Sequence, residues 1–364
     1  MVRDFAEKEI NPKISELEKK GEFPRDILKK LGELNLYGMV IPEEYGGAGL
    51  DHISCNLVIE ELARICPSIA VTVSVTNSVY CYPVWKFGTD EQKQKFLLPC
   101  ARGDFLGAFA LTEPQAGSDA ANQKTKAVPD GNTYVLNGVK AWVTNGPESG
   151  IVLVIAVVNR GEDKKISAFI VEPGTEGFEI GTVEDKLGLR CSSTSEIVLT
   201  DCRVPKENLL GEEGDGLKIA LHSLDASRIG IGAQCVGIGQ RALELAIQYA
   251  KEREQFGRPI AKFQAIQFML SDMAMELEAA SMLVMRAAYL LDQDRKMTAA
   301  ASQAKLYASE MVNRVVGMAL QIHGGVGYSK EFDIERFYRD ARATTIYEGT
   351  SEVQRIVIAR QLLS

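Results

Sequence analysis

The spacing of apolar residues changes twice along the chain, and this change limits the possible folds more than any other feature. Up to about Arg102, and again from Leu217, apolar side chains recur at helical intervals. Between these regions lie short β-branched segments separated by turn residues, at 151–158, 166–171, 178–183 and 196–199. We therefore expect a multidomain α+β protein. Its predicted parts are an N-terminal all-α domain (1–102), a middle antiparallel β-sandwich or barrel (103–216) and a C-terminal four-helix bundle (217–364).

The predicted bundle has three long helices and a short terminal one. Long helical patterns run over about 217–253, 265–291 and 298–322. Asp130-Gly131 is typical of a hairpin turn within 128–134, and Thr89 to Gln92 has the pattern of a capping box. Two glycine motifs are rejected as nucleotide sites. Gly237 to Ala242 lacks a preceding strand, and Gly46 to Gly49 lacks a P-loop ending.

Composition disfavours several classes of protein. A net charge of −8 and a pI near 5.2 disfavour a nucleic-acid surface. No apolar run approaches the roughly 20 residues that span a bilayer, and Met1 to Glu9 lacks the apolar core of a signal peptide. The seven cysteines form no C-x-x-C pair and the three histidines are scattered, so neither a metal site nor a disulfide framework is expected. A reducing compartment fits best, either a bacterial cytoplasm or a mitochondrial matrix, and secretion is not expected.

The segment Tyr347-Glu348-Gly349-Thr350-Ser351-Glu352 contains the main catalytic candidate. A carboxylate beside aliphatic neighbours and a glycine can act as a base, because burial raises its pKa and glycine admits a substrate close to the backbone. The alternative interpretation is a helix start, with Ser351 as the cap and Gln354 completing a capping box. Taken alone, the segment favours the helix start, since caps far outnumber catalytic acids.

Four other segments could contact a polar or aromatic ligand, and each has an ordinary structural alternative. The loop Phe109 to Asp119 can offer hydroxyl and backbone donors, or simply end a strand. Trp142 to Asn145 can wall a planar ring or pack in a core. Arg253 with Phe256 can bind a diphosphate and a ring, and Gln321 to Gly325 can bind a pyrophosphate. Helix termination explains these last two segments almost as well.

Together, in this order, the motifs resemble the acyl-CoA dehydrogenase family across nearly the whole chain. The resemblance rests on Leu111 to Pro114 with Gly117 to Asp119, Trp142 to Asn145, Arg253 with Gln255 to Gly257, Gln321 to Gly325, Tyr338 to Ala341, and Ile346 to Glu352. The segments Lys186 to Arg190 and Leu224 to Ile231 are most similar to the short-chain, butyryl-CoA branch of the family.

The resemblance implies an FAD flavoprotein that converts a short-chain acyl-CoA to the trans-2-enoyl-CoA. In this scheme Glu348 removes the α-proton and the β-hydrogen passes to the flavin as hydride. The implied FAD contacts are Phe109, Leu111, Thr112, Gly117, Ser118, Trp142, Val143, Thr144, Arg253, Phe256, Gln264, Gln321, Gly324, Gly325, Thr350, Ser351 and Glu352. The implied substrate contacts are Ser118, Asp225, Ala226, Ser227, Arg228 and Gly349.

The family is usually a homotetramer, a dimer of dimers, in which Arg253, Phe256, Gln264 and Gln321 to Gly325 reach the FAD of a neighbouring subunit. The resemblance also implies an electron-transferring flavoprotein as the acceptor, with no nucleic acid and no membrane insertion. One branch of the family places its base at the position of Ser227; a serine cannot serve there, which favours Glu348.

Other functions stay open at this point. The aromatic residues Tyr80, Tyr82 and Trp85 could shorten an acyl pocket or adapt it to a branched or cyclic acyl group. An acyl-CoA oxidase would use the same half-reaction but usually has a longer chain. A non-catalytic flavin-binding or scaffold relative is the third alternative, and the apparently intact base and flavin motifs disfavour it.

Overall fold

The computed structural model describes residues 1–160 and 163–363 of the chain. It begins with a helical region whose apolar faces are buried against one another. Asp51 accepts a hydrogen bond from the Ser54 N–H at the start of one helix, and Thr89 and Gln92 form the predicted capping box. The elements are α1 (Val2–Phe5), η1 (Ala6–Ile10), α2 (Asn11–Lys20), α3 (Arg25–Glu33), η2 (Glu43–Tyr45), α4 (His52–Ile65), α5 (Pro67–Val75), η3 (Thr76–Cys81), α6 (Tyr82–Phe87), α7 (Asp90–Gln92), η4 (Lys93–Leu97) and α8 (Leu98–Ala101).

The middle region is one curled sheet with its own core. Residues 151–158 are buried because their strand lies inside the sheet, which accounts for their continuous apolar run. A core cluster separate from the helical core joins both halves of the curled sheet. The sheet has the order β6-β7-β3-β2-β4-β5-β8, with β1 also paired to β4. The strands are β1 (Leu106–Ala110), β2 (Lys126–Asp130), β3 (Thr133–Thr144), β4 (Ser149–Arg160), β5 (Asp163–Val171), β6 (Phe178–Val183), β7 (Thr194–Pro205) and β8 (Leu209–Leu210).

Two strand pairings differ from the predicted antiparallel arrangement. β1 and β2 both run parallel to β4, with Gly107 opposite Ile151 and Lys126 opposite Val157. Alternating apolar residues do not reveal strand direction, since direction depends on how the connections cross the sheet. The hairpin predicted at 128–134 is present, but its two-residue loop is Gly131-Asn132, one residue later than expected. The sheet is therefore mixed.

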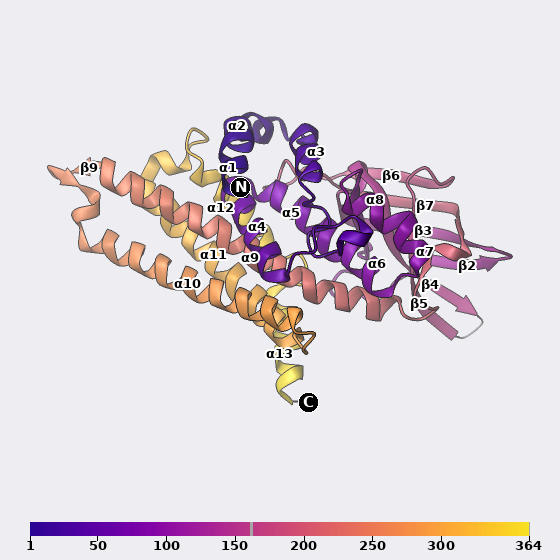
Figure 1. Cartoon of the computed structure of the whole chain (residues 1–364). Coiled ribbons are helices and arrows are strands. Elements are labelled where there is room, and N and C mark those ends of the chain that lie inside the picture. Colours follow the sequence, from indigo (N-terminus) through magenta and orange to yellow (C-terminus); the bar gives the residue numbers. More distant parts are fainter. Residues whose placement is uncertain (161–162, 364) are drawn as a thin grey trace.

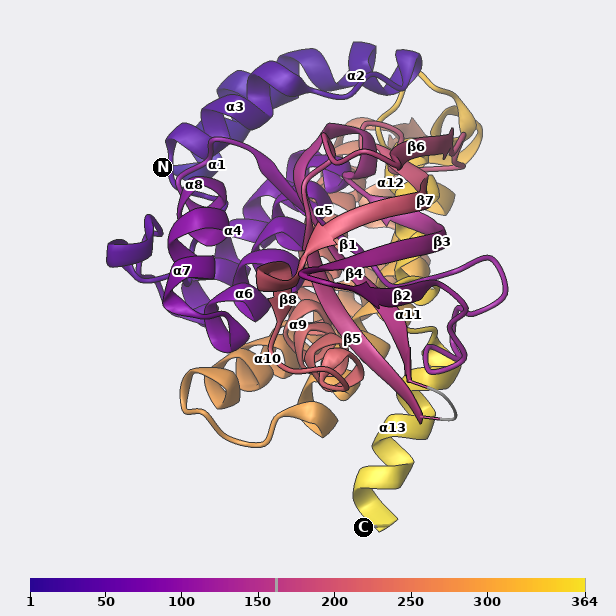
Figure 2. The ribbon, with the colours of Figure 1, turned by 90° about the vertical axis from the view of Figure 1, so that its right-hand side faces the viewer.

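The C-terminal region contains the three long helices expected from the sequence. They are α9 (Gly216–Glu252), α10 (Gln264–Asp292) and α11 (Thr298–His323). β9 (Glu254–Gln255), β10 (Arg258–Pro259) and η7 (Ile260–Lys262) join the first two, at the end of the molecule opposite the sheet (Figure 1). α4 packs along α9. The N-terminal helices therefore lie against both the bundle and the sheet (Figure 2).

The chain after α11 is less regular than the expected single helix. It contains η8 (Gly324–Tyr328), α12 (Ile334–Arg342), η9 (Ala343–Thr345) and α13 (Ser351–Leu363). α13 packs on α11 near its start and then projects from the molecule (Figure 1), with Leu362 and Leu363 exposed. Within the described residues, no helix is both long and apolar enough to cross a membrane. We keep 1–102, 103–216 and 217–364 as proposed domain boundaries.

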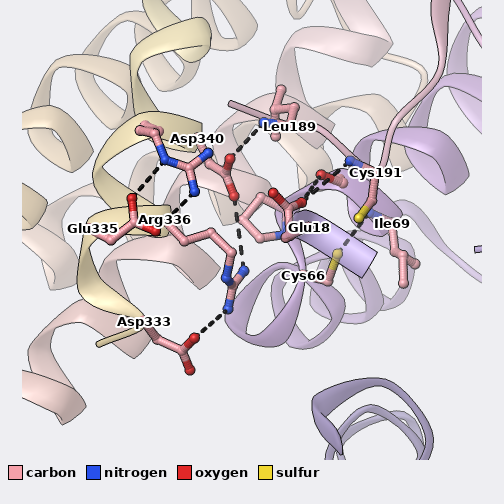
Figure 3. A network of polar contacts seen from close by, with 12 residues as sticks. Glu18, Cys66, Ile69, Leu189, Cys191, Asp333, Glu335, Arg336 and Asp340 are labelled. Atoms are coloured by element: carbon pink, nitrogen blue, oxygen red, sulfur yellow. Dashed lines mark hydrogen bonds and ion pairs between the residues drawn. The ribbon is translucent and has the colours of Figure 1, made fainter. Parts of the chain in front are cut away.

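All three regions meet at a buried polar junction beside α12 (Figure 3). Asp340 accepts a hydrogen bond from the Leu189 N–H at 2.6 Å, and Glu18 accepts one from the Cys191 N–H at 3.4 Å. Arg336 Nη1 lies 4.0 Å from Asp340 Oδ2. We call Glu18, Leu189, Cys191, Arg336 and Asp340 the junction cluster. It fixes the short helix that leads into the segment containing Glu348.

Candidate active site

Glu348 lies in a tight turn between η9 and α13, and its backbone is strained. Its φ is +53° and that of Gly349 is +89°, so two successive residues adopt the left-handed region. The positive φ of Gly349 favours glycine, and a Cβ there would also force the Gln354 side chain to shift, because it would lie 2.7 Å from Gln354 Nε2. For glutamate the left-handed conformation is unfavourable, and surrounding contacts must maintain it.

Side chains from three helices hold the carbonyl groups of this turn. Gln354 Nε2 donates to the Glu348 oxygen at 3.1 Å and to the Gly349 oxygen at 3.0 Å. Arg228 Nε, on α9, donates to the Glu348 oxygen at 3.4 Å. Lys305 Nζ, on α11, donates to the Gly349 oxygen at 2.7 Å. The preceding Tyr347 donates its hydroxyl to Gln234 on α9. The turn is thus fixed from several sides.

The Glu348 carboxyl group has the electrostatic environment of a general base. Burial raises its pKa, while the nearby Ser227 hydroxyl, Arg228 and Lys305 oppose this rise. Its Oε2 atom is buried and has no partner among the described residues. Within the same residues the Glu348 N–H donates to no other group. An unpaired carboxylate oxygen and an unpaired N–H lie in one turn, available to a ligand. We call Ser227, Arg228, Lys305 and Glu348 the base cluster.

The predicted substrate residues Asp225, Ala226, Ser227, Arg228 and Gly349 meet at this turn. Arg228 Nη1 lies 2.7 Å from Asp225 Oδ1, and Thr298 donates its hydroxyl to Asp225 Oδ2 at 2.6 Å. Arg228 is thereby fixed between Asp225 and the Glu348 carbonyl. Ser118, the remaining predicted contact, lies exposed on the loop after β1.

The cap of α13 differs from the prediction. Thr350, not Ser351, accepts the hydrogen bond from the Val353 N–H, at 3.3 Å. Ser351 is the first helical residue and its hydroxyl has no partner within the described part of the chain. Gln354 reaches back to the carbonyl groups of Glu348 and Gly349 and does not complete a capping box. The helix start therefore supports the turn rather than competing with it.

The loop after β1 and the end of β3, predicted to hold the flavin ring, lie side by side. The Ala141 N–H donates to the Thr112 oxygen at 2.9 Å, which joins the two segments. Trp142 sits in a β-bulge with φ +58° and is 59% exposed, which turns its ring outward from the sheet. Val143 is buried, Gly117 is exposed and a Cβ there would meet no atom within 4 Å, and Phe109, Leu111, Thr112 and Thr144 are half-buried. The core-packing interpretation of Trp142 is therefore wrong.

A buried ion pair that the sequence did not reveal supports this loop. Lys140 Nζ lies 2.8 Å from Glu113 Oε1 and also donates to the Leu111 oxygen at 3.1 Å. Glu113 in turn accepts from the N–H groups of Lys124 and Thr125. Burial lowers the pKa of Lys140 to about 8, although Glu113 opposes this. A sequence signal existed only in part, since Glu113 belongs to a recognised motif and Lys140 does not.

A surface groove with a volume of about 500 Å³ adjoins the base turn. It is lined by the start of α13, including Thr350, Ser351 and Glu352, and by residues of α11. Large grooves with a few convergent polar groups are typical ligand sites. Three of the predicted flavin contacts thus line a cavity that could receive part of a dinucleotide.

The remaining predicted flavin contacts gather at the opposite end of the bundle. His323 stacks on Tyr249 with ring centroids 4.5 Å apart, which places the end of α11 beside the end of α9. Phe256 is 93% exposed there. This tip of the bundle lies far from the sheet in the same chain (Figure 1). We call the following residues the bundle tip: Arg253, Phe256, Gln264, Gln321, Gly324 and Gly325.

A helical region, a sheet and a helical bundle, together with a buried glutamate carboxyl group, define a class of protein. Comparison with family models identifies this class. Residues 1–104 match the N-terminal domain of acyl-CoA dehydrogenases, residues 108–202 the middle domain and residues 214–363 the C-terminal domain. The chain belongs to the acyl-CoA dehydrogenase family.

Individual relatives place it more closely. The mitochondrial short-chain specific acyl-CoA dehydrogenase of Rattus norvegicus is 50% identical over 362 residues, 99% of this chain and 88% of the relative. The structure of butyryl-CoA dehydrogenase from Megasphaera elsdenii has a TM-score of 0.98 and 45% identity, over 100% of this chain and 96% of that one. A Bacillus anthracis acyl-CoA dehydrogenase complexed with FAD has a TM-score of 0.95 and 39% identity, over 100% and 65%.

Proposed function

We propose that this protein is an FAD-dependent acyl-CoA dehydrogenase that oxidises a short-chain acyl-CoA to the trans-2-enoyl-CoA. The observation that carries the proposal is the Glu348 turn, where a buried carboxylate oxygen and a backbone N–H both lack partners among the described residues. The similarity to short-chain and butyryl-CoA dehydrogenases supports the substrate class.

Glu348 removes the α-proton of the thioester. An α C–H is too weakly acidic for a carboxylate in water, so charge developing on the thioester oxygen must be stabilised. The Glu348 N–H is a suitable donor for that oxygen, because the turn leaves it free. Burial raises the pKa of the carboxyl group, which makes its ionised form a stronger base.

The proposed FAD contacts form two sets of residues within one subunit, and the bundle tip forms a third set. The segments around Thr112 and Trp142 hold the ring, and Thr350 to Glu352 line the groove beside the base turn. When bound, FAD accepts the β-hydrogen as hydride. The exposed Trp142 ring and the open space at Gly117 fit a planar group beside these segments.

The bundle tip belongs to the site of a neighbouring subunit in this proposal. Phe268, Met275, Met282 and Tyr289 are exposed at intervals of seven residues along α10. Apolar residues at this interval form one face of a helix that packs against another helix. We therefore propose a homotetramer, built as a dimer of dimers, in which a second copy brings its bundle tip to the flavin. Without assembly, the six bundle-tip residues would have no ligand.

Ser118 and Asp225 to Arg228 contact the CoA portion. A cavity of about 30 Å³ is lined by Tyr82, Ala226 and Gly230 among other residues. We expect butyryl-CoA to be preferred over a branched or cyclic acyl-CoA, because the chain is similar to short-chain and butyryl-CoA dehydrogenases. An electron-transferring flavoprotein reoxidises the protein, in a bacterial cytoplasm or a mitochondrial matrix.

The spectrum of the purified protein tests these statements. Butyryl-, isobutyryl-, hexanoyl-, glutaryl- and cyclohexanecarbonyl-CoA are added without oxygen, and the flavin absorbance is followed. Bleaching that is fastest with butyryl-CoA is expected. A colourless protein that takes up no FAD would disprove the cofactor, and flavin that no acyl-CoA bleaches would point to a non-catalytic relative. Fastest bleaching by isobutyryl- or cyclohexanecarbonyl-CoA would identify a branched or cyclic substrate.

A further inference from the structure

Lys305, on α11, is a buried cation without a carboxylate partner. Its side chain is fully buried, and no carboxylate among the described residues forms an ion pair with it. Burying an ammonium group away from a counter-ion is unfavourable. Burial accordingly lowers the pKa of Lys305 to about 8. Packing alone does not require this charge, since an apolar side chain of similar length would avoid the penalty.

The hydrogen bond from the Lys305 side chain to the base turn explains why the charge is kept. Its ammonium donates to the Gly349 oxygen at 2.7 Å, directly beyond the strained Glu348. Gln354 donates to the same oxygen at 3.0 Å. Gln354 and Arg228 also donate to the Glu348 oxygen, so the peptide planes on both sides of Gly349 are held and the backbone of Glu348 has little freedom to turn.

The charge also acts on the base itself. The groups that face Lys305 electrostatically are Glu348 and Glu352 from the turn and α13, and Arg228 and Cys235 from α9. Its positive charge opposes the rise in the pKa of Glu348 caused by burial. Lys305 therefore links the position of the base to its protonation.

We propose that Lys305 is a positioning residue for α-proton transfer. It holds the Gly349 carbonyl so that the Glu348 carboxylate and N–H both face the thioester, and its charge favours the ionised carboxylate. This inference rests on the proposed function, because it assumes that Glu348 is the base.

Lys305→Met removes the charge and the donor but keeps most of the volume. We expect it to retain FAD, yet to reduce its flavin about 10–100-fold more slowly with butyryl-CoA, because a misdirected base reacts poorly. The acid limb of the pH profile should move up by about 0.5–1 pH unit, as a nearby positive charge is lost. Lys305→Gln restores a donor without the charge. It should recover part of the rate, but its acid limb should stay shifted as in Lys305→Met.

Ser309→Ala is a matched control on the same helix. Ser309 is buried and, among the described residues, its hydroxyl donates within α11 to the Leu306 oxygen, so the rate of flavin reduction and its pH dependence in this variant should match those of the parent protein. A parent-like rate and limb in Lys305→Met would overturn the proposal. If both Lys305 variants reduce their flavin more slowly but the acid limb of the pH profile does not move, Lys305 only packs against the turn and the proposal is wrong.

A measurement without turnover separates this proposal from the proposed function. The carboxyl band of Glu348 is identified by infrared difference spectra against Glu348→Gln, and its titration is followed with and without Lys305→Met. A pKa of Glu348 that rises in the variant supports the proposal even if no acyl-CoA bleaches the flavin. An unchanged pKa would overturn it even in an active enzyme. Lys305→Gln serves the same measurement if Lys305→Met does not fold.

Discussion

The junction cluster and the base cluster lie at the two ends of one short segment, and burial raises the pKa of an acid in each, but only at the junction does a second acid add to the rise. Asp340 is fully buried, and burial together with the Glu18 carboxyl group raises its pKa to about 7, although Arg336 opposes this. Glu348 is flanked by two cations, Arg228 and Lys305, which oppose the rise caused by burial. Asp340 faces an acid as well as the cations Arg336 and Arg339, so it keeps its proton up to about pH 7 and links parts of the protein. A buried acid facing cations stays ionisable and can accept a proton.

Replacing each acid by its amide is the most direct test of whether Glu348 and Asp340 have different roles. Glu348→Gln should slow anaerobic flavin reduction by about 10³–10⁴-fold, because the proton acceptor is lost. Asp340→Asn should change that rate by less than about threefold, since an amide can replace a protonated carboxyl group. Stopped-flow absorbance with butyryl-CoA measures both. A loss in Asp340→Asn as large as that in Glu348→Gln would make the junction part of the catalytic machinery.

The pH dependence of kcat/KM should follow the ionisation of Glu348 and be independent of Asp340. Glu348 must be ionised to accept a proton, so activity should rise as pH increases through its pKa. Burial places this acid limb above the ordinary glutamate value of about 4.3. The limb should be the same in Asp340→Asn. A limb that moves in this variant would mean that the two acids titrate as one system.

The protonation of Asp340 should instead affect how the stability of the folded protein depends on pH. Because the pKa of Asp340 is raised to about 7, the folded protein holds a proton there that the unfolded chain releases near pH 4. This contribution to stability is complete below about pH 4 and is lost as pH rises through about 7. Asp340→Asn should match the parent protein near pH 4 and exceed its Tm by about 2–5 °C at pH 8. Calorimetry that shows a constant difference across this range would contradict the assignment.

The smallest expected effect is a difference in stability between variants of two neighbouring hydroxyl residues, Thr350 and Ser351. Thr350→Ala removes the cap of α13 and should cost about 1 kcal/mol of stability, whereas Ser351→Ala should cost less than about half of that. Denaturant unfolding of the FAD-free protein measures both without the flavin contacts proposed for these residues. Equal losses would mean that Ser351 shares the capping role.

The sequence predicted the elements with strong local signals. Apolar periodicity located α9, α10 and α11 to within about two residues, and family motifs pointed to Glu348 before any geometry was known. Periodicity did not predict α12, although Ile334, Phe337 and Ala341 recur at helical intervals and are buried in the core, because its nine residues are shorter than the window over which such a repeat is recognised. The cap was assigned to Ser351 because both hydroxyl residues fit the pattern, and only the backbone decides between them. Lys140 and Lys305 could not be predicted, since a lysine is buried only when distant carbonyl groups or acids meet it.

The packing of α4 along α9 has a consequence for how the chain is made. Arg64 on α4 bonds to Glu244 on α9, 180 residues away in sequence. A ribosome adding about 5–20 residues each second exposes the apolar face of α4 for roughly ten seconds or more before α9 emerges. During that interval the N-terminal helices lack α9, and their exposed apolar surface is of the kind that chaperones bind. A nascent chain stalled before α9 should therefore be digested by protease along α4, and one released after α9 should resist.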